Sequence, residues 1–457
     1  MEQIQKENKM GVMQENKLLL SMSLPMMVSM LVQALYNVVD SVFVSRISEN
    51  ALTSVSLAFP VQNFMIAVSV GTAVGVNALL SKTLGEKDYE KAQKIANNAV
   101  FLAAVCYVVF LLVGIFAVAP FYLTQTKDAE IIEYGKQYLT IICIGSVGIF
   151  FQTMFERLLQ STGKTFYTMI TQGTGAIINI ILDPLLIFGV GIFPKMGVAG
   201  AALATIIGQI VAAILAIVFN AMHNEYITIR VGQIRPNAHI IKQIYAVGAP
   251  SIVVQAIGSV MVYGMNLILI AFSSTATAVF GVYFKLQSFI FMPVFGLNNG
   301  MVPIIAYNYG AGKKSRVVKI IKLSIAYAVG IMFVGLIILQ IIPDKLLLMF
   351  NASETMLAIG VPALRIISTS FLFAGFCIVC GSVFQALGNG VYSMCVSITR
   401  QLLVLLPVAY LLSKLGEIRY VWFAFPIAEI VSLTLSSIFL CIIYRKKIRH
   451  IGEGKTL

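Results

Sequence analysis

The feature that most limits how this chain can fold is a succession of twelve apolar runs. A helix needs about 20 apolar residues to cross a hydrocarbon core of roughly 30 Å, and each run is long enough to do so. Hydrophobic residues make up 59% of the chain and charged residues only 11%, which excludes an ordinary water-soluble domain. The runs lie at residues 18–44, 52–80, 96–123, 131–159, 167–192, 197–219, 240–272, 276–306, 317–342, 356–386, 392–412 and 420–444. We therefore predict an all-α integral membrane protein with twelve transmembrane helices.

Lysine and arginine are distributed unevenly among the loops between these runs. If the N-terminus is cytoplasmic, the inner segments carry 21 Lys and Arg and the outer segments carry seven. Inner loops of membrane proteins carry an excess of positive charge, so this asymmetry predicts that both termini are cytoplasmic. The net charge of +13 is then explained by topology, and we expect no nucleic-acid partner. The polar first 17 residues are not followed by a small-residue cleavage site after the first run, so we expect no cleaved signal peptide.

An internal repeat with an offset of 225 residues divides the chain into two homologous halves. Each half contains six runs, so both should enter the bilayer in the same orientation and be related by an axis along the membrane normal. The matched pairs include Pro25 with Pro250, Gln62 with Gln287, Gly71 with Gly296, Gly75 with Gly300, Gly163 with Gly388 and Gly191 with Gly416. The repeat predicts two pseudo-symmetric six-helix bundles around a central cleft. The expected parts are a cytoplasmic segment at 1–17, an N-lobe at 18–222, a cytoplasmic interlobe linker at 223–239, a C-lobe at 240–444 and a basic tail at 445–457.

Charged side chains inside the apolar runs need a reason, because one at the centre of a bare helix costs about 2.5 to 3.5 kcal/mol. Eight of these residues are the candidates for a functional role: Asp40, Glu156, Arg157, Asp183, Lys285, Arg365, Arg400 and Glu429. Asp40 has Asn37 three residues earlier, and Asp183 has Asn179 four residues earlier, so each acid shares a helix face with an amide. At about 1.5 Å per residue, the two acids can reach a similar depth. Pro184, next to Asp183, can free a backbone carbonyl as an oxygen ligand.

Three segments resemble a known family: N-I-I-L-D-P-L-L-I-F-G at 179–189, M-V-P-I-I-A-Y-N-Y-G-A at 301–311, and the first run, P-M-M-V…Y-N-V-V-D-S-V-F-V. All three resemble the multidrug and toxic compound extrusion (MATE) family, in particular its MepA-like bacterial branch. The resemblance covers nearly the whole chain. It implies a multi-pass protein of the bacterial plasma membrane that works as a secondary active antiporter. It further implies export of cationic or aromatic organic compounds in exchange for H⁺ or Na⁺ by alternating access.

The resemblance also implies a cation-coupling site at Asp40, Asn37, Asn179 and Asp183, with Na⁺ held by Asp40, Asn179 and Asp183. A carboxylate in a cavity loses its charge by binding a proton or a metal cation, and either would compete with a cationic drug. The residues leave open whether H⁺ or Na⁺ is used, and also whether Asp40 instead caps a helix near the outer interface. The seventh and tenth runs lack Asp and Glu, so we expect no second Na⁺ site in the C-lobe.

Three further charged residues are candidates for the substrate cavity. Glu156 either faces the cavity or forms a structural pair between the lobes. Glu429 fits the family's P-x-A-E pattern and is otherwise a hydrogen-bonded structural acid. Lys285 is expected to balance acidic charge across the cleft.

Two other classes of function compete with antiport. A flippase for a lipid-linked precursor shares the wider superfamily fold, but this chain has twelve runs and more acids than bases at the candidate site. An enzyme is not expected, because the three His residues lie outside the runs and no Walker loop or nucleophile elbow is present. We expect no cofactor besides the coupling ion. The expected partners are small hydrophobic cations and membrane lipids, and the chain is expected to be a monomer.

Overall fold

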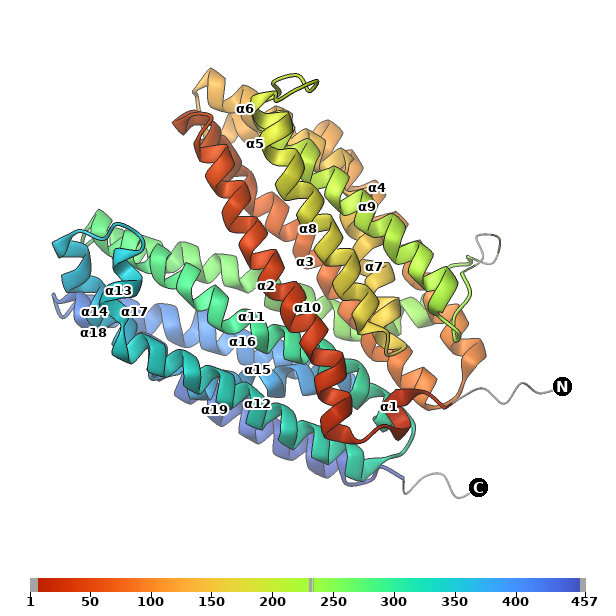
Figure 1. Ribbon diagram of the computed structural model, residues 1–457. Helices are drawn as coiled ribbons and strands as arrows, with labels where there is room; N and C mark the ends of the chain where they lie inside the picture. The colour runs from red at the N-terminus through yellow and green to blue at the C-terminus, as the bar shows by residue number, and fades with distance from the viewer. Residues whose placement is uncertain (1–6, 230–231, 233, 453–457) are drawn as a thin grey trace. The chain divides into compact units, whose positions relative to one another are not determined.

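The computed structural model describes residues 7–229, 232 and 234–452, and within these ranges the chain is helical and contains no β-strand (Figure 1). Three of the basic residues in the topology argument, Lys6, Arg230 and Lys455, lie outside the described residues. The α-helices are α1 Lys9–Val12, α2 Glu15–Ser45, α3 Glu49–Gly85, α4 Tyr89–Phe116, α5 Val118–Gln125, α6 Ala129–Ile144, α7 Val147–Ser161, α8 Thr165–Phe188, α9 Val198–His223, α10 Ala238–Ile270, α11 Ser274–Gly310, α12 Lys314–Ile341, α13 Pro343–Leu348, α14 Glu354–Ser368, α15 Phe371–Ala386, α16 Gly390–Ile398, α17 Leu406–Ser413, α18 Ile418–Val421 and α19 Ala424–Ile443. Two π-helical segments, η2 Thr399–Leu405 and η3 Tyr444–Ile448, continue α16 and α19.

The described residues contain eleven helical segments long and apolar enough to cross a membrane, and a bent pair supplies the twelfth. That pair is α14 and α15, whose axes differ by 51° across Thr369 and Ser370. Both hydroxyl groups donate to carbonyls of the preceding turn, to Ile366 O at 2.7 Å and Ile367 O at 2.6 Å. Such bonds compete with the helical ladder and favour a bend. The apolar run predicted at 356–386 is therefore one span made of two helices.

The repeat seen in the sequence recurs in the bounds of the helices. α3 and α11 begin and end at residues separated by the same offset of 225, and so do α4 and α12. The equivalent of α8 is the continuous stretch made of α16, η2 and α17. The loop glycines Gly163 and Gly388 share a left-handed backbone, with φ of 87° and 78°, which residues other than glycine rarely adopt. The two halves therefore follow the same backbone plan.

Two compact units make up the structure, and their boundaries fall inside helices. Unit 1 runs up to Met27 and resumes at Ala249, and unit 2 comprises residues 28–248. The first turns of α2 therefore belong to unit 1 together with α11–α19, and the first turns of α10 belong to unit 2 together with α3–α9. The halves expected from the sequence, 18–222 and 240–444, keep each first helix whole. Both unit boundaries lie within two residues of the repeated prolines Pro25 and Pro250.

Glycines on α3 and α11 make room for these exchanged first turns. In unit 1, a Cβ added at Gly300 would lie 2.5 Å from Ser23 Oγ. In unit 2, a Cβ added at Gly75 would lie 2.2 Å from the carbonyl oxygen of Ile244. Gly75 and Gly300 thus allow close helix contact, and each lies against a segment from the other half of the sequence.

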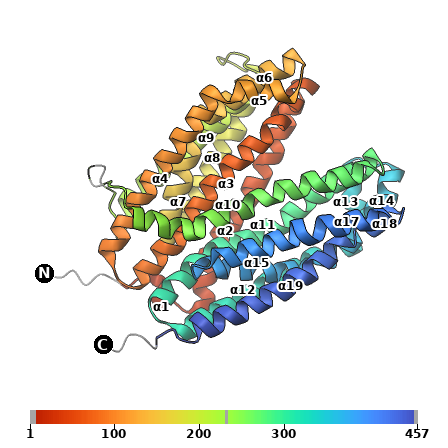
Figure 2. The same cartoon turned by 180° about the vertical axis from the view of Figure 1, so that it is seen from behind.

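Equivalent helices form the core of each unit. In unit 2, α3 packs against α4, α6 and α7, and α9 packs against α6, α7 and α8 (Figure 2). In unit 1, α11 packs against α12, α14 and α15, and α15 packs against α19. Long apolar helices with small residues at their crossings account for this packing.

Candidate functional site

Two acids predicted to lie at a similar depth come together in unit 2. Asp40 lies on α2 and Asp183 on α8, and their carboxyl groups are within hydrogen-bonding distance of each other. Asp183 is completely buried and Asp40 is half-buried. Two carboxylates this close in apolar surroundings repel each other strongly unless a proton or a cation lies between them. The pair can therefore hold one small positive charge.

Asn179 and Thr205 support the Asp183 carboxyl. In the orientation that satisfies both ends of its amide, Asn179 donates to Asp183 Oδ2 at 3.3 Å. Its amide oxygen accepts from Thr205 on α9, from the backbone N at 3.1 Å and from Oγ1 at 3.2 Å. Asn179 is one turn before Asp183 and is buried, as its spacing predicts. This network fixes the carboxyl group of Asp183 between α8 and α9.

Both acids keep unused hydrogen-bonding capacity. Oδ1 of Asp40 and Oδ1 of Asp183 are buried and have no hydrogen-bond partner among the described residues. Pro184 lies inside α8 and has no N–H to donate to the carbonyl of Ile180 one turn earlier. Carboxylate and carbonyl oxygens are hard ligands, so these groups suit Na⁺ as well as a proton.

Aromatic and amide side chains surround the pair. Tyr36, one turn before Asp40, lies close enough to interact electrostatically with both carboxyl groups. Tyr138 on α6 lies near Asp40 and close to Gln62 on α3. Asn37 is exposed on α2, and its carbonyl accepts from Ser41 Oγ at 2.9 Å. The buried surroundings of the acid pair thus contain Tyr36, Tyr138 and Thr205, which sequence reasoning missed.

Glu156 is separate from this pair and is enclosed by protein donors. It is buried on α7, and its Oε1 accepts from Gln152 at 3.0 Å and from Thr171 at 2.8 Å. Its Oε2 accepts from Gln172 at 2.7 Å. The neighbouring Arg157 donates to Gln160 at 2.8 Å, so these adjacent charges have different hydrogen-bond partners. All of these partners of Glu156 belong to unit 2.

Glu429 and Lys285 both lie in unit 1 but in different surroundings. Glu429 on α19 is buried and forms an ion pair with Arg400 of η2, with 2.7 Å between Nη1 and Oε1. Oε2 of Glu429 has no hydrogen-bond partner among the described residues. The pair lines a cavity of about 60 Å³ together with Tyr283, Gln287 and other side chains. Lys285 is exposed on α11, with its Nζ 5.9 Å from the ring centre of Phe350.

Comparison with known proteins agrees with this architecture. A family model described as MatE matches residues 25–185 and 250–411. The multidrug export protein MepA of Staphylococcus saprophyticus is 27% identical over 410 residues, covering 89% of each chain. The MepA of Staphylococcus haemolyticus is 26% identical over 421 residues, covering 92% of each. The structure of a multidrug resistance MATE family transporter of the MOP superfamily in its outward-facing conformation is 24% identical, with a TM-score of 0.89, covering 96% of this chain and 97% of that one.

The candidate membrane spans and the fold shared with that structure define a multi-pass helical membrane protein. The chain belongs to the MatE family, the multidrug and toxic compound extrusion family, and resembles its MepA-like members. The family resemblance predicted from three sequence segments is confirmed.

Proposed function

We propose that this protein is a multidrug efflux antiporter that exports cationic or aromatic organic compounds in exchange for H⁺ or Na⁺ by alternating access. The observation that carries the proposal is the pair of carboxyl groups from α2 and α8, which meet inside the apolar bundle of unit 2. A structural role alone would favour a neutral or ion-paired arrangement, because unpaired charge is costly within a membrane. The names of the MepA relatives support multidrug export.

Exchange follows from competition for one charge. With a proton or Na⁺ bound between Asp40 and Asp183, the pair carries one negative charge instead of two and attracts an organic cation less strongly. When the small ion leaves, the two acids regain negative charge and favour a cationic substrate. The membrane potential favours inward movement of the small ion by about 2.3 kcal/mol per charge per 100 mV. Asn179 orients Asp183, and exposed Asn37 lies one turn before Asp40 on α2 and completes the proposed cation-coupling set.

The other three charged candidates, Lys285, Glu156 and Glu429, have different surroundings, and we propose different roles for them. Lys285 is exposed on a membrane-spanning helix and stays a candidate for the substrate cavity, where its ammonium group would balance acidic charge. Glu156 and Glu429 already have protein partners, so we assign them to the framework of their own units. The positive-inside count supports cytoplasmic termini for both ends of the chain in the proposed bacterial plasma-membrane protein. The proposed antiporter acts as a monomer.

The proposal is tested with the full chain in proteoliposomes loaded with ethidium. A pH gradient and a Na⁺ gradient are imposed separately, and ethidium movement is followed by fluorescence. We expect one of the two gradients to drive transport, and Asp183→Asn to reduce it to background because an amide binds neither ion well. Asp344→Asn, an exposed aspartate on α13, serves as the matched control and should keep full transport.

Three outcomes would contradict the proposal. Transport by Asp183→Asn at the wild-type rate would remove the acid pair from the mechanism. Failure of both gradients to drive transport would exclude antiport with H⁺ or Na⁺. Translocation of a lipid-linked saccharide in the same vesicles, without ethidium transport, would favour the flippase alternative.

A further inference from the structure

Unit 1 carries a groove lined by lysines at one end of α12. The helix begins at Lys314, and Lys314, Lys319 and Lys322 line a groove of about 430 Å³ together with Ser315 and Val318. These positions recur every three or four residues, so they share one face of the helix. Lys319 and Lys322 are exposed. The groove therefore presents three ammonium groups along about two turns.

The C-terminal end of α19 adds more positive charge beside this groove. Lys314 Nζ donates to the carbonyl oxygen of Arg449 at 2.7 Å, which joins the start of α12 to the residue after η3. Arg445 and Lys446 of η3 are exposed, and so is Arg449. We use the term basic corner for Lys314, Lys319, Lys322, Arg445, Lys446 and Arg449.

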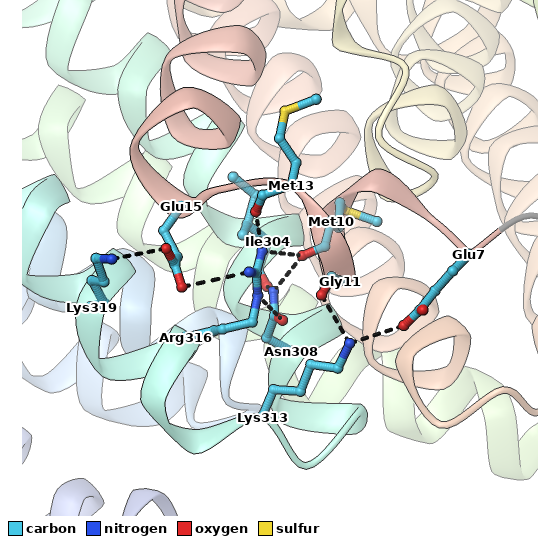
Figure 3. Close-up of polar contacts among 10 residues, drawn as sticks. All are labelled: Glu7, Met10, Gly11, Met13, Glu15, Ile304, Asn308, Lys313, Arg316 and Lys319. Carbon is cyan, nitrogen blue, oxygen red and sulfur yellow. Dashed lines mark hydrogen bonds and ion pairs between the residues drawn. The ribbon is translucent and has the colours of Figure 1, made fainter.

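Acidic residues neutralise only the edge of the basic corner. Glu15 lies 3.0 Å from Lys319 and 3.5 Å from Arg316, and Glu7 lies 3.0 Å from Lys313 (Figure 3). Arg316 and Asn308 also donate to backbone carbonyls of α1 and its flanks (Figure 3). These contacts tie the N-terminal segment to Lys319 at one edge of the groove and to Lys313 and Arg316 beside it. No acidic partner is found among the described residues for Lys314, Lys322, Arg445, Lys446 or Arg449.

The internal repeat supplies a comparison within the same molecule. The corner of unit 2 at the equivalent positions has Tyr89 for Lys314, Asn97 for Lys322 and Asn220 for Arg445. Lys94, the equivalent of Lys319, is paired with Glu90 at 2.6 Å. The general preference for positive charge in inner loops applies to both corners. It does not explain why one of them has six basic residues and the other is nearly neutral.

The depth of the groove indicates which anion it fits. Lys314 opens one candidate membrane span and Ile448 closes another, so the basic corner lies at a membrane–water interface. Lys322 lies eight residues inside its span, about 12 Å from Lys314 along the helix. A soluble polyanion would have to enter the lipid to reach it, whereas a phospholipid phosphate lies at the interface and long Lys side chains extend toward it.

We propose that the basic corner is a binding site for the headgroup of an anionic phospholipid. The phosphodiester lies in the groove formed by Lys314, Lys319 and Lys322, and Arg445, Lys446 and Arg449 surround its outer edge. The acyl chains follow the apolar part of α12. The site is independent of the acid pair in unit 2 and does not require transport.

The test uses the full chain purified in detergent, with native mass spectrometry to count retained phosphatidylglycerol against phosphatidylcholine. The test variant carries Lys314→Gln, Lys322→Gln, Arg445→Gln and Lys446→Gln. The matched control carries Lys82→Gln, Lys87→Gln, Lys91→Gln and Lys94→Gln, which removes the same number of charges from the end of α3, the start of α4 and the turn between them in unit 2. We expect the test variant to lose phosphatidylglycerol affinity by about tenfold or more, and the control to bind as the wild type does.

A second variant distinguishes loss of positive charge from misfolding. Replacing Lys314, Lys322 and Lys446 by Arg keeps the charge and should preserve selective phosphatidylglycerol binding. Equal losses in the two Gln variants would show a general charge effect and overturn the proposal. So would equal retention of both lipids by the wild type, or displacement of phosphatidylglycerol by inorganic phosphate alone at a similar concentration, which would indicate a site for free anions.

Discussion

Arg400 and Glu429 place two opposite charges inside the helical bundle of unit 1. Their single close contact, 2.7 Å between Nη1 and Oε1, leaves Oε2 of the acid without a hydrogen-bond partner among the described residues. A buried ion pair contributes little net stability, because both charges lose their hydration. Removing only one partner is much more harmful, since the other charge then remains buried and unpaired.

Arg400→Gln is therefore expected to lower the free energy of unfolding by about 3 kcal/mol or more. The double variant Arg400→Gln with Glu429→Gln should recover most of that loss, because neither charge is left alone. Thermal unfolding in detergent, followed by tryptophan fluorescence, measures both. Arg365→Gln, at an exposed arginine on α14, is the control and should unfold as the wild type does. Equal destabilisation in the single and double variants would contradict this account.

For single residues, the depth of a side chain in the bundle can be predicted from the sequence, whereas the residues from other helices that surround it cannot. The matching depth of Asp40 and Asp183 followed from helix rise and from residue spacing alone. The support from Thr205 and the proximity of Tyr138 did not, because both lie on other helices and their contacts depend on how those helices are rotated. A Thr or Tyr in an apolar run gives no periodic signal that distinguishes a site from ordinary packing.

Among the structural elements, α11 shows how a missing side chain controls helix contact. Gly300 lies against the backbone of Ser23, and an added Cβ would come within 2.5 Å of Ser23 Oγ and 2.7 Å of its Cα. Gly281 on the same helix has no atom within 4 Å of the corresponding position. Both glycines have a helical backbone, and they differ only in how closely other residues pack against them. Substitutions at Gly300 and Gly281 can therefore be compared as a variant and its matched control.

Gly300→Ala should therefore destabilise the protein by about 1 to 3 kcal/mol, since the helices must move apart to admit the methyl group. Gly281→Ala should be neutral or stabilise by about 0.5 to 1 kcal/mol, because alanine favours the helix more than glycine does. The comparison uses thermal midpoints of the two purified variants. A Gly300→Ala protein as stable as the Gly281→Ala protein would show that the α11 contact is looser than the structure indicates.

Most helices could be predicted from hydropathy, but the positions of their breaks could not. The run at 131–159 is divided into α6 and α7 at Gly145, where an added Cβ would lie 2.2 Å from Ile206 Cδ1. The break thus lets α9 approach closely. Hydropathy measures affinity for lipid and not the local backbone path, so a broken span and a straight span give the same signal.

For the whole molecule, the central feature is the exchange of first turns between the two units. Unit 1 includes the start of α2 up to Met27, and unit 2 includes the start of α10 up to Gly248. The six-helix halves expected from the sequence are therefore not the compact units. A half expressed alone would lack the segment that fills the glycine-lined face of its α3 or α11.

We expect a chain cut between Arg235 and Pro236 to behave accordingly. Each fragment expressed alone should be degraded or aggregated, and the two expressed together should yield a stable complex in the membrane. Fluorescence-detected size-exclusion chromatography of tagged fragments measures this. A single fragment that accumulates as a monodisperse species would contradict the expectation that each half depends on the other.

The reciprocal exchange also bears on the ancestry of the chain. If a gene for one half once stood alone, two parts of its product lacked a packing partner. These were the glycine-lined face of the helix equivalent to α3 and α11, and the first turns of the helix equivalent to α2 and α10. In a dimer of that product, each copy could have packed the first turns of its first helix against the other copy, as in domain-swapped dimers. Fusion of two copies of the gene would then have joined the two halves of an existing dimer. The acid pair, Asp40 and Asp183, would have arisen later in the first half alone.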